Sequence, residues 1–346
     1  MRTRGEKLYL LGMDFDKLHH RQEQFLALTS LYPSEFDLLF KAFLPRWEQW
    51  FKHHNFQQKR RAKPLTAKQL ARPTTTLPTP EEKLFFVLYL YKTHPLQQTA
   101  AATFDMSQAQ VSRWKKVLTP LLVRTLRDLD LHAAENTEEL IDLFRRRQQQ
   151  APVERRAESL HLDATERTIQ RNLDYATQKL DYSGKQRVHT IKNSVVCDER
   201  QFVHFVGPTW RGAMHDKSMI AEELPGLDHP VFDELWLSKD SGYQGYDPPG
   251  VHLLASLKAF RNHPLTPEDQ KWNSWVGSIR VVVENAISGI KRLRACAERH
   301  RKFLQHRAHQ TIRIATGLHN LRVQYRPDSY LKADSCVCAN LFSLRV

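Results

Sequence analysis

Residues 188–206 read VHTIKNSVVCDERQFVHFV, two β-prone runs on either side of a short polar turn. The first run, Val188 to Cys197, is rich in β-branched residues, and the second, Phe202 to Val206, alternates aromatic and aliphatic side chains. Both compositions are typical of strands. The Asp198-Glu199-Arg200 segment between them predicts a hairpin turn. The stretch therefore predicts two sheet strands joined by a tight connection.

Further β-prone runs flank this hairpin in the sequence. They are Leu160–Asp163, Leu235–Leu237 and His252–Leu257. Helical patterns follow at Ile279–Arg294 and Phe303–Arg322. Strands that come first and helices that come between and after them predict an α/β domain, with a mixed sheet flanked by helices.

The sequence before this domain has a helical character. Residues 20–56 and 81–150 carry apolar side chains at helical spacing, and a connecting helix is expected over 121–150. Between them, residues 57–80 are basic and rich in Pro and Thr, which predicts a linker. The expected plan is a helical lead-in at 1–56, the linker at 57–80, a DNA-binding region at 81–150, a catalytic domain at 151–326 and a tail at 327–346.

Residues 97–114 fit a helix-turn-helix, in an all-α N-terminal region. Ala101 is small, as two closely crossing helices require, and Asp105 tolerates the left-handed turn conformation. Ser107 is a good N-cap for the second helix. Val111 and Trp114, with Leu118, recur at helical spacing and should face the core.

The polar residues of the second helix would then face outward. They are Gln108, Ser112, Arg113 and Lys116. In this position their side chains can reach base edges or phosphates. The alternative is an ordinary helical hairpin with a polar face.

The overall charge favours a polyanionic partner. Lys and Arg total 52 against 38 Asp and Glu, for a net charge of +14. An excess of this size is typical of nucleic-acid binding, although a merely basic soluble protein is the alternative. The four cysteines form neither a disulfide framework nor a complete zinc site, which indicates free thiols. No secretory signal and no apolar run of the ~20 residues that a membrane span needs is visible, so a cytoplasmic protein without a membrane partner is expected.

Two acidic residues stand at the ends of β-prone runs. Asp163 ends the first run, and Asp240 follows the run at 235–237 and precedes Ser241 and Gly242. Loops at strand ends are where a sheet presents catalytic groups. A third candidate, Glu284, lies in a helical pattern between Arg280 and Lys291, where Asn285 and Gly289 allow another chain or DNA to approach closely.

Three carboxylates on separate elements suit Mg²⁺ or Mn²⁺, which bind oxygen ligands and substrate phosphates. Two such ions activate the attacking oxygen and stabilise the leaving oxygen of an in-line displacement. The structural alternative makes Glu284 a salt-bridge partner of Arg280 and treats both aspartates as caps.

Taken together, these motifs resemble bacterial insertion-sequence transposases of the DDE class, in the branch related to eukaryotic Harbinger elements. The motifs that carry this resemblance are Val111-Ser112-Arg113-Trp114, Asp163-Ala164-Thr165-Glu166-Arg167, Gly212-Ala213-Met214-His215-Asp216, Asp240-Ser241-Gly242-Tyr243-Gln244-Gly245, Arg280-x₃-Glu284-x₆-Lys291 and Gly317-Leu318-His319-Asn320-Leu321. The chain departs from related groups at Gly277, where they carry Tyr three positions before the Arg.

The resemblance implies an RNase H-like core with a mixed five-stranded sheet. It implies Asp163 on the first strand, Asp240 after the fourth and Glu284 on a later helix, as catalytic residues that hold two Mg²⁺ or Mn²⁺ ions. Arg280 and Lys291 would hold terminal DNA near the metals. His215 and Asp216 would support the site, although a helix N-cap by Asp216 explains that motif equally well.

The implied function is a DNA transposase. It would bind double-stranded DNA at element ends, hydrolyse a phosphodiester and join the freed 3′-hydroxyl to target DNA. A homodimer or higher oligomer on DNA is expected because two element ends must meet, and the expected location is the bacterial nucleoid. Two alternatives stay open: a DNA-binding regulator derived from a transposase, and a metal-dependent endonuclease without strand transfer.

Overall fold

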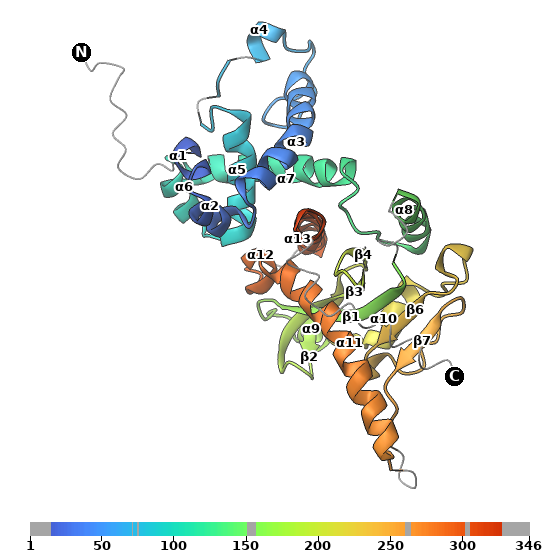
Figure 1. The fold of residues 1–346 in the computed structure, drawn as a ribbon. Coiled ribbons are helices and arrows are strands. Elements are labelled where there is room, and N and C mark those ends of the chain that lie inside the picture. Colours follow the sequence, from blue (N-terminus) through green and yellow to red (C-terminus); the bar gives the residue numbers. More distant parts are fainter. Residues whose placement is uncertain are drawn as a thin grey trace, which may run out of the picture. The chain divides into compact units, whose positions relative to one another are not determined.

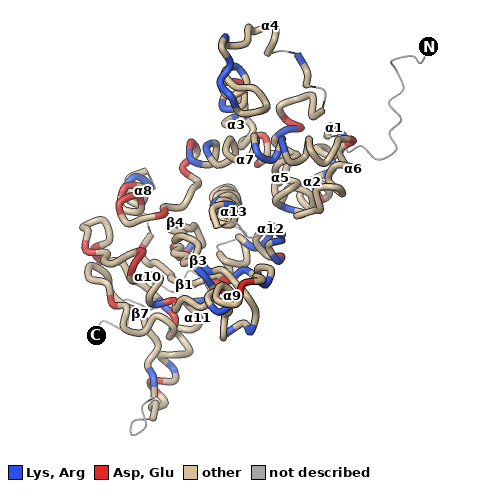
Figure 2. Tube along the Cα trace, turned by 180° about the vertical axis from the view of Figure 1, so that it is seen from behind, with Lys and Arg blue, Asp and Glu red and all other residues tan. Residues whose placement is uncertain are grey.

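The computed structural model describes residues 15–70, 72–74, 76–150, 157–259, 264–301 and 305–326 (Figure 1). The chain divides into two compact units, one made of residues 1–129 with 292–295 and the other of residues 130–291 with 296–346. Lys and Arg occur along both units (Figure 2). Each unit is described by itself.

The first unit is all-helical. Its helices are α1 (Phe15–His19), α2 (Gln22–Thr29), α3 (Pro33–His53), α4 (Ala67–Leu70), α5 (Pro80–Thr93), α6 (Gln97–Thr103) and α7 (Gln108–Asp128). The core is rich in aromatic residues, because Phe25, Phe36, Phe43 and Phe85 are almost completely buried. Burial of such large apolar surfaces is the main stabilising force of a unit of this size.

The connection between α6 and α7 has the predicted local geometry. Asp105 adopts the left-handed conformation with φ 48°. The Ser107 hydroxyl accepts a hydrogen bond from Gln110 N at 3.2 Å, and the Gln110 side chain returns one to Ser107 N. Val111 and Trp114 are buried, as predicted. The two helices therefore form a capped helical hairpin.

The end of the predicted linker is packed onto this unit. Trp114 Nε1 donates a hydrogen bond to Thr76 Oγ1 at 2.9 Å. The buried Lys83 ammonium donates to the carbonyl oxygens of Leu77 and Thr79 and lies 4.9 Å from the ring centroid of Trp47. These contacts hold the loop before α5 against α3 and α7.

The connecting helix expected over 121–150 is interrupted. Helix α7 ends at Asp128, and α8 (Thr137–Gln150) begins only after a non-helical segment. Within that segment Ala134 N donates to His204 O at 2.8 Å, and Val206 N donates to Ala134 O at 2.9 Å. Pairing with the edge of the sheet satisfies these backbone groups outside a helix, a tertiary contact that helical periodicity does not reveal.

The second unit is built on a mixed sheet. Its strands are β1 (Ser159–Thr168), β2 (Tyr182–Ser183), β3 (Val188–Asp198), β4 (Val203–Val206), β5 (Trp210–Arg211), β6 (Trp236–Lys239) and β7 (His252–Ala255). The strand order is β2-β3-β1-β6-β7, with β4 and β5 also paired to β3. Strand β3 runs antiparallel to β1, β2, β4 and β5, whereas β6 is parallel to both β1 and β7. The described residues form seven strands where five were expected, and the two-residue strands β2 and β5 make the difference.

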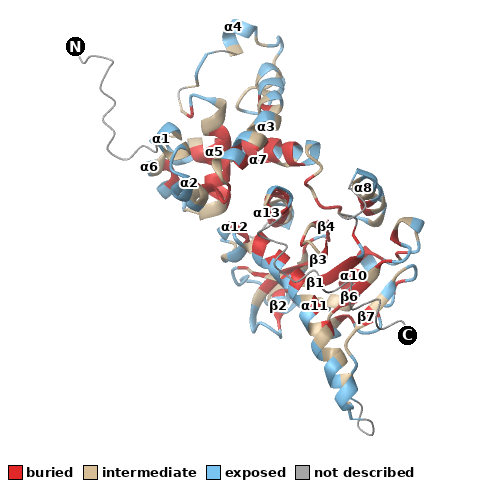
Figure 3. Cartoon of the chain, in the orientation of Figure 1, coloured by how far each residue is buried: buried red, intermediate tan, exposed pale blue. Residues whose placement is uncertain are grey.

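Helices cover both faces of this sheet, which confirms the predicted α/β architecture. On one face, α8 and α10 (Asp216–Glu223) pack on Leu160, Leu162 and Val196 in an apolar cluster. On the other face lie α11 (Pro267–Lys291), which packs on β1, β3 and β6, and α13 (Gln305–Tyr325), which packs on α11 and β4. The central strands are therefore buried (Figure 3).

Shorter elements complete the second unit. They are α9 (Tyr175–Asp181), η2 (Pro230–Phe232), η3 (Ser241–Tyr243) and α12 (Arg294–Ala297), the last of which is shared with the residues assigned to the first unit. Cys197 and Cys296 are buried free thiols, as predicted. The predicted thiols Cys336 and Cys338 lie outside the described residues, as does the tail at 327–346.

Candidate active site

The register of two parallel strands places Asp163 beside Asp240. In the β1–β6 pairing Leu160 lies opposite Leu237 and Leu162 lies opposite Lys239, so the next residue on each chain is one of the two aspartates. Parallel strands present paired residues on the same face of a sheet. Both carboxylates therefore lie side by side at the end of β6, on the face covered by α11.

Each aspartate is oriented by a local backbone contact. Asp163 Oδ1 accepts a hydrogen bond from Ala164 N at 2.7 Å. Asp240 Oδ1 accepts one from Ser241 N at 2.6 Å and caps the short helix η3. The structural alternative, in which the aspartates are caps, thus holds for Asp240. The cap uses one carboxylate oxygen and leaves the other available to a ligand.

Arg280 on α11 connects the third carboxylate to this pair. Its Nη1 lies 3.2 Å from Asp240 Oδ1, and its Nη2 lies 3.8 Å from Glu284 Oε1. The Glu284 side chain is 58% exposed, so it lies at the rim of the site. The predicted i,i+4 ion pair is therefore present, and the same guanidinium group also reaches an aspartate on another element.

The electrostatics of the site favour an added cation. Burial raises the pKa of Asp163, and the charge of Asp240 raises it further, while Arg280 and Lys185 act in the opposite direction. Burial lowers the pKa of the Lys291 ammonium, and the charges of Glu166 and Asp163 oppose that change. Burial and mutual repulsion disfavour two adjacent ionised carboxylates, and a cation bound between them would relieve both effects.

The predicted stripe on α11 is divided between two environments. Arg280 and Glu284 face the aspartate pair, whereas Lys291 interacts electrostatically with Glu166, further along β1, as well as with Asp163. Gly289 was expected to admit DNA or another chain. Instead it admits α13, because a Cβ at this position would lie 2.5 Å from His319 Cε1. The close approach is therefore between two helices of the same unit.

His215 and Asp216 lie at the start of α10. The N-cap is His215, whose Nδ1 accepts a hydrogen bond from Lys217 N at 3.3 Å, so the predicted cap by Asp216 is wrong. Asp216 is the first residue of the helix, and its Oδ1 lies 3.0 Å from Lys192 Nζ. Lys192 also pairs with Glu166 at 3.5 Å, which joins α10 to β1 and β3.

Comparison with known protein families assigns this part of the chain. Residues 162–320 match the family model of the DDE superfamily endonucleases. This part of the chain is similar to DDE superfamily endonucleases. The match begins one residue before Asp163 and includes Asp240 and Glu284. No curated protein and no solved structure matches the chain.

The assignment supports the coarse features predicted from the sequence. A DDE endonuclease domain indicates nuclease activity on DNA, and enzymes of this superfamily depend on divalent metal ions. In the part of the chain that the structure describes, no helix is long and apolar enough to cross a membrane.

The donor set of this endonuclease domain fits a hard divalent cation. Asp163, Asp240 and Glu284 offer only carboxylate oxygens, the ligands that Mg²⁺ and Mn²⁺ prefer. In the described ranges no three Asp, Glu, His or Cys side chains come close enough together to hold a metal ion. The two aspartates are adjacent, whereas Glu284 reaches them only through Arg280. A shared metal site therefore requires the exposed Glu284 side chain to turn toward the aspartates.

Tyr243 is a residue of this domain to which sequence reasoning gave no role. It ends η3, three positions after Asp240, and is almost completely buried. Its hydroxyl group has no hydrogen-bond partner among the described residues. Burial raises the pKa of this phenol far above its usual value, and the charges of Asp163 and Asp216 raise it further. The hydroxyl group is therefore neutral and lies within electrostatic reach of the carboxylates.

A buried chain of hydrogen bonds supports the strand that carries Asp163. His161 Nδ1 lies 2.8 Å from Ser238 Oγ on β6, and His161 Nε2 lies 3.1 Å from Ser159 Oγ. Ser159 Oγ in turn donates to Glu199 Oε2 in the hairpin at 3.3 Å. Burial lowers the pKa of His161 to about 4, so the ring is neutral at pH 7. These contacts tie β1 to β6 two residues before the aspartate pair.

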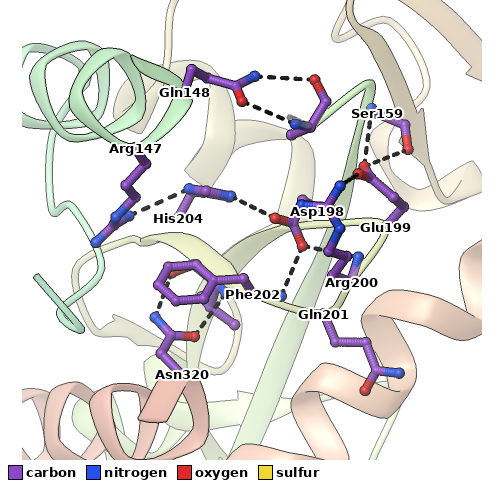
Figure 4. Close-up of polar contacts among 12 residues, drawn as sticks. Arg147, Gln148, Ser159, Asp198, Glu199, Arg200, Gln201, Phe202, His204 and Asn320 are labelled. Carbon is purple, nitrogen blue, oxygen red and sulfur yellow. Dashed lines mark hydrogen bonds and ion pairs between the residues drawn. The ribbon is translucent and has the colours of Figure 1, made fainter. Parts of the chain in front are cut away.

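The hairpin itself is fixed from both sides (Figure 4). His204 lies between Arg147 of α8 and Asp198, with Nδ1 3.3 Å from Arg147 Nη1 and Nε2 3.1 Å from Asp198 Oδ2. Asn320 of α13 accepts a hydrogen bond from Val203 N at 2.8 Å. The central strand β3, next to β1, is thereby held between helices on opposite faces of the sheet.

Proposed function

We propose that this protein is a DNA transposase that uses Asp163, Asp240 and Glu284 as catalytic metal ligands. It binds element ends, hydrolyses a phosphodiester there and transfers the freed 3′-hydroxyl to target DNA. The observation that carries this proposal is the parallel register of β1 and β6, which sets Asp163 beside Asp240. No packing requirement explains two adjacent carboxylates under a helix that carries a third.

The sheet topology supports an RNase H-like core. The antiparallel strands β4, β3 and β1 are followed by β6 and β7, which run parallel to β1, in the order β4-β3-β1-β6-β7. The three carboxylates then come from the first strand, the end of the fourth and a later helix, as the resemblance implied.

Two Mg²⁺ or Mn²⁺ ions are the proposed cofactors. When bound, such ions activate the attacking oxygen and stabilise the leaving oxygen of the in-line displacement. Asp163, in the middle of β1, and Asp240, directly after β6, would hold the metals, and Glu284 would complete the ligand set from α11. Arg280, now paired with Asp240 and Glu284, is then available to hold a DNA phosphate.

DNA contacts are proposed for both units. Gln108, Ser112, Arg113 and Lys116 are exposed on α7 and would read the element end as the second helix of a helix-turn-helix. Arg280 and Lys291 would hold terminal DNA. His215 and Asp216 have a supporting role, in which Asp216 keeps Lys192 in place beside the site.

The proposed assembly is a homodimer or a higher oligomer on DNA, because two element ends must be joined. The proposed location is with the DNA of a bacterial nucleoid. This branch of the superfamily, related to Harbinger elements, is the one that the Arg280-x₃-Glu284-x₆-Lys291 motif favours.

The test is cleavage of a labelled duplex that carries the candidate element end, in the presence of Mg²⁺. Wild type should cut, and Glu284→Gln should bind the duplex but lose at least about a hundredfold in rate, since a neutral amide is a poor metal ligand. Glu268→Gln is a matched control, because Glu268 is exposed in the first turn of the same helix. Equal cutting by both variants would show that Glu284 is not a ligand.

Two outcomes separate the alternatives. If wild type binds the duplex but does not cut it with Mg²⁺ or Mn²⁺, the chain is a regulator derived from a transposase. If it cuts but gives no joined product with a target duplex, it is an endonuclease without strand transfer.

A further inference from the structure

The part of the sequence that connects β1 to β3 in the second unit exposes several large apolar side chains. Residues 171–188 form α9, β2 and the turn that leads into β3. Leu173 is fully exposed, Tyr175 is 68% exposed, Leu180 is 53% exposed and Tyr182 is 44% exposed. A group of large apolar side chains on a soluble protein is typical of an interaction site. We call these four residues, with Lys179 and Lys185, the α9 surface.

The α9 surface rests on a firmly attached base. The buried Asp181 carboxylate accepts a hydrogen bond from Arg211 Nη1 at 2.8 Å, and Ala213 N donates to Leu180 O at 3.0 Å. Gly212 allows this close approach, since a Cβ there would overlap Asp181 O. These anchoring contacts use backbone and buried groups, and the Tyr182 ring adds an edge contact with His189 on β3, with ring centroids 5.8 Å apart.

The charge of the α9 surface favours an anionic partner. Lys179 Nζ lies 4.9 Å from the ring centroid of Tyr175, and Lys185 and Arg187 are exposed nearby in the sequence. The acidic residues of the segment are engaged elsewhere, because Asp174 caps α9 and Asp181 pairs with Arg211. Exposed aromatic rings beside cations are what single-stranded nucleic acid requires: stacking for its bases and positive charge for its phosphates.

Strand β3 and Lys185 connect the α9 surface to the candidate active site. Strand β3 begins at Val188 and reaches Val195, which lies opposite Asp163. The charge of Lys185 also lowers the pKa of Asp163, so this lysine is within electrostatic reach of the catalytic carboxylate. A DNA strand whose phosphate lies at the aspartates can therefore place neighbouring nucleotides on the α9 surface.

We propose that the α9 surface binds unpaired bases at the cleaved DNA end, stacking them on Tyr175 and Tyr182 while Lys185 holds the adjoining phosphate. This inference rests on the proposed function at the same site. Paired DNA hides its base faces within the stack, so exposed tyrosine rings gain binding energy only from bases that have left the duplex. The surface would thus favour a locally opened end next to the scissile phosphate.

The experiment compares a fully paired element end with the same end opened by a few terminal mismatches. The double variant Tyr175→Ala with Tyr182→Ala should cut the paired end about tenfold or more slowly, because it loses two stacking partners. The mismatched end should restore most of the rate, because opening it no longer depends on the protein. The matched control is the double Phe variant, which keeps both rings and should cut like wild type.

A second readout does not require cutting. The fluorescence of 2-aminopurine at the end of the duplex should be quenched when wild type or the Phe variant binds without divalent metal, and not when the Ala variant binds. If wild type quenches but never cuts, the proposed chemistry is wrong and the base-binding surface stands.

Other results would overturn the inference. If the Ala variant cuts both substrates like wild type and quenches equally, the tyrosines do not hold bases. If the Ala variant slows both substrates equally and its particle mass in solution falls, the α9 surface is a contact between copies of this chain.

Discussion

Gly289 offers the sharpest test of how α11 is seated. A Cβ at this position would lie 2.5 Å from His319 Cε1 and closer still to Nδ1, whereas carbon atoms in ordinary contact are about 3.5–4.0 Å apart. His319 is completely buried, and its Nε2 lies 2.8 Å from Gln201 O. Gly289 O also accepts a hydrogen bond from Arg322 Nη2 at 2.6 Å. In Gly289→Ala the ring cannot withdraw without breaking its bond, so α11 and α13 must separate by about 1 Å.

The cost follows from three contributions. Overpacking costs about 1–3 kcal/mol and loss of the His319–Gln201 hydrogen bond about 1 kcal/mol, while the better helix propensity of Ala returns about 1 kcal/mol. The free energy of unfolding should therefore fall by about 1–3 kcal/mol, which lowers the thermal midpoint by roughly 2–12 °C. Cleavage should also slow, because Gly289 lies between Glu284 and Lys291 on the same helix.

Thermal unfolding followed by circular dichroism measures this effect. Gly277→Ala is the matched control, since it makes the same change on the same helix where nothing lies within 4 Å of the added Cβ. That variant should be stabilised by about 0.5–1 kcal/mol. If Gly289→Ala is as stable as Gly277→Ala, the packing of α11 on α13 is not as described.

Three further predictions test other parts of the molecule. Burial raises the pKa of Glu223 to about 7, so its protonated form stabilises the fold below pH 4.5 and that stability is lost as the pH rises through 7. Glu223→Gln should therefore gain stability relative to wild type by up to about 3 kcal/mol between pH 4.5 and 8. A pH-independent stability difference between the two proteins in urea unfolding would refute this prediction. Arg113→Ala should weaken binding of an element-end duplex about tenfold in a gel-shift titration, and an equal loss in Arg124→Ala, an exposed position on the same helix, contradicts sequence reading by Arg113. His161→Leu should lower the free energy of unfolding by about 2 kcal/mol, measured by thermal unfolding, because Ser238 loses its buried hydrogen-bond partner. The same variant should cleave DNA more slowly without binding it more weakly, and unchanged cleavage would show that this hydrogen bond does not align the aspartates.

The local structure of both units could be predicted from short-range patterns. The Val188–Val206 hairpin, the Ser107 cap and the left-handed Asp105 depend on neighbouring residues, and all three are present. Periodicity and turn chemistry act over the distances that a sequence window covers. The same holds for the existence of the five main strands, whose residues alternate or run apolar within a few positions. The predicted end of the first strand at Asp163 is wrong, because β1 continues to Thr168 through its pairing with β3.

Contacts between distant segments could not be predicted in this way. Ala134 leaves the expected connecting helix because it pairs with β4, and Gly289 serves the packing of α13. The sequence motifs identified Asp163 and Asp240 as candidate site residues, but only the β1–β6 register shows that they lie side by side. Register between strands 77 positions apart depends on the packing of the whole sheet.

The roles of single side chains in the site were the least predictable. Asp216 was a candidate N-cap, yet His215 caps α10 and Asp216 pairs with Lys192. Tyr243 follows Asp240 in a quoted motif, but its buried hydroxyl is visible only once η3 turns it inward. Both side-chain roles depend on the residue at which a short helix begins. Sequence patterns locate that residue only to within one or two positions.

The central claim is that the aspartate pair holds the metal ions for DNA cleavage, and a metal-specificity switch at Asp240 tests it most directly. Asp240→Cys replaces a hard oxygen ligand with a softer thiolate, which Mn²⁺ tolerates better than Mg²⁺. The variant should lose at least about a hundredfold in cleavage rate with Mg²⁺ and regain a measurable part of it with Mn²⁺. Asp233→Cys, at an exposed position before β6, should cut like wild type with either ion. Cleavage by Asp240→Cys at the wild-type rate with Mg²⁺ would contradict the assignment of Asp240 as a metal ligand.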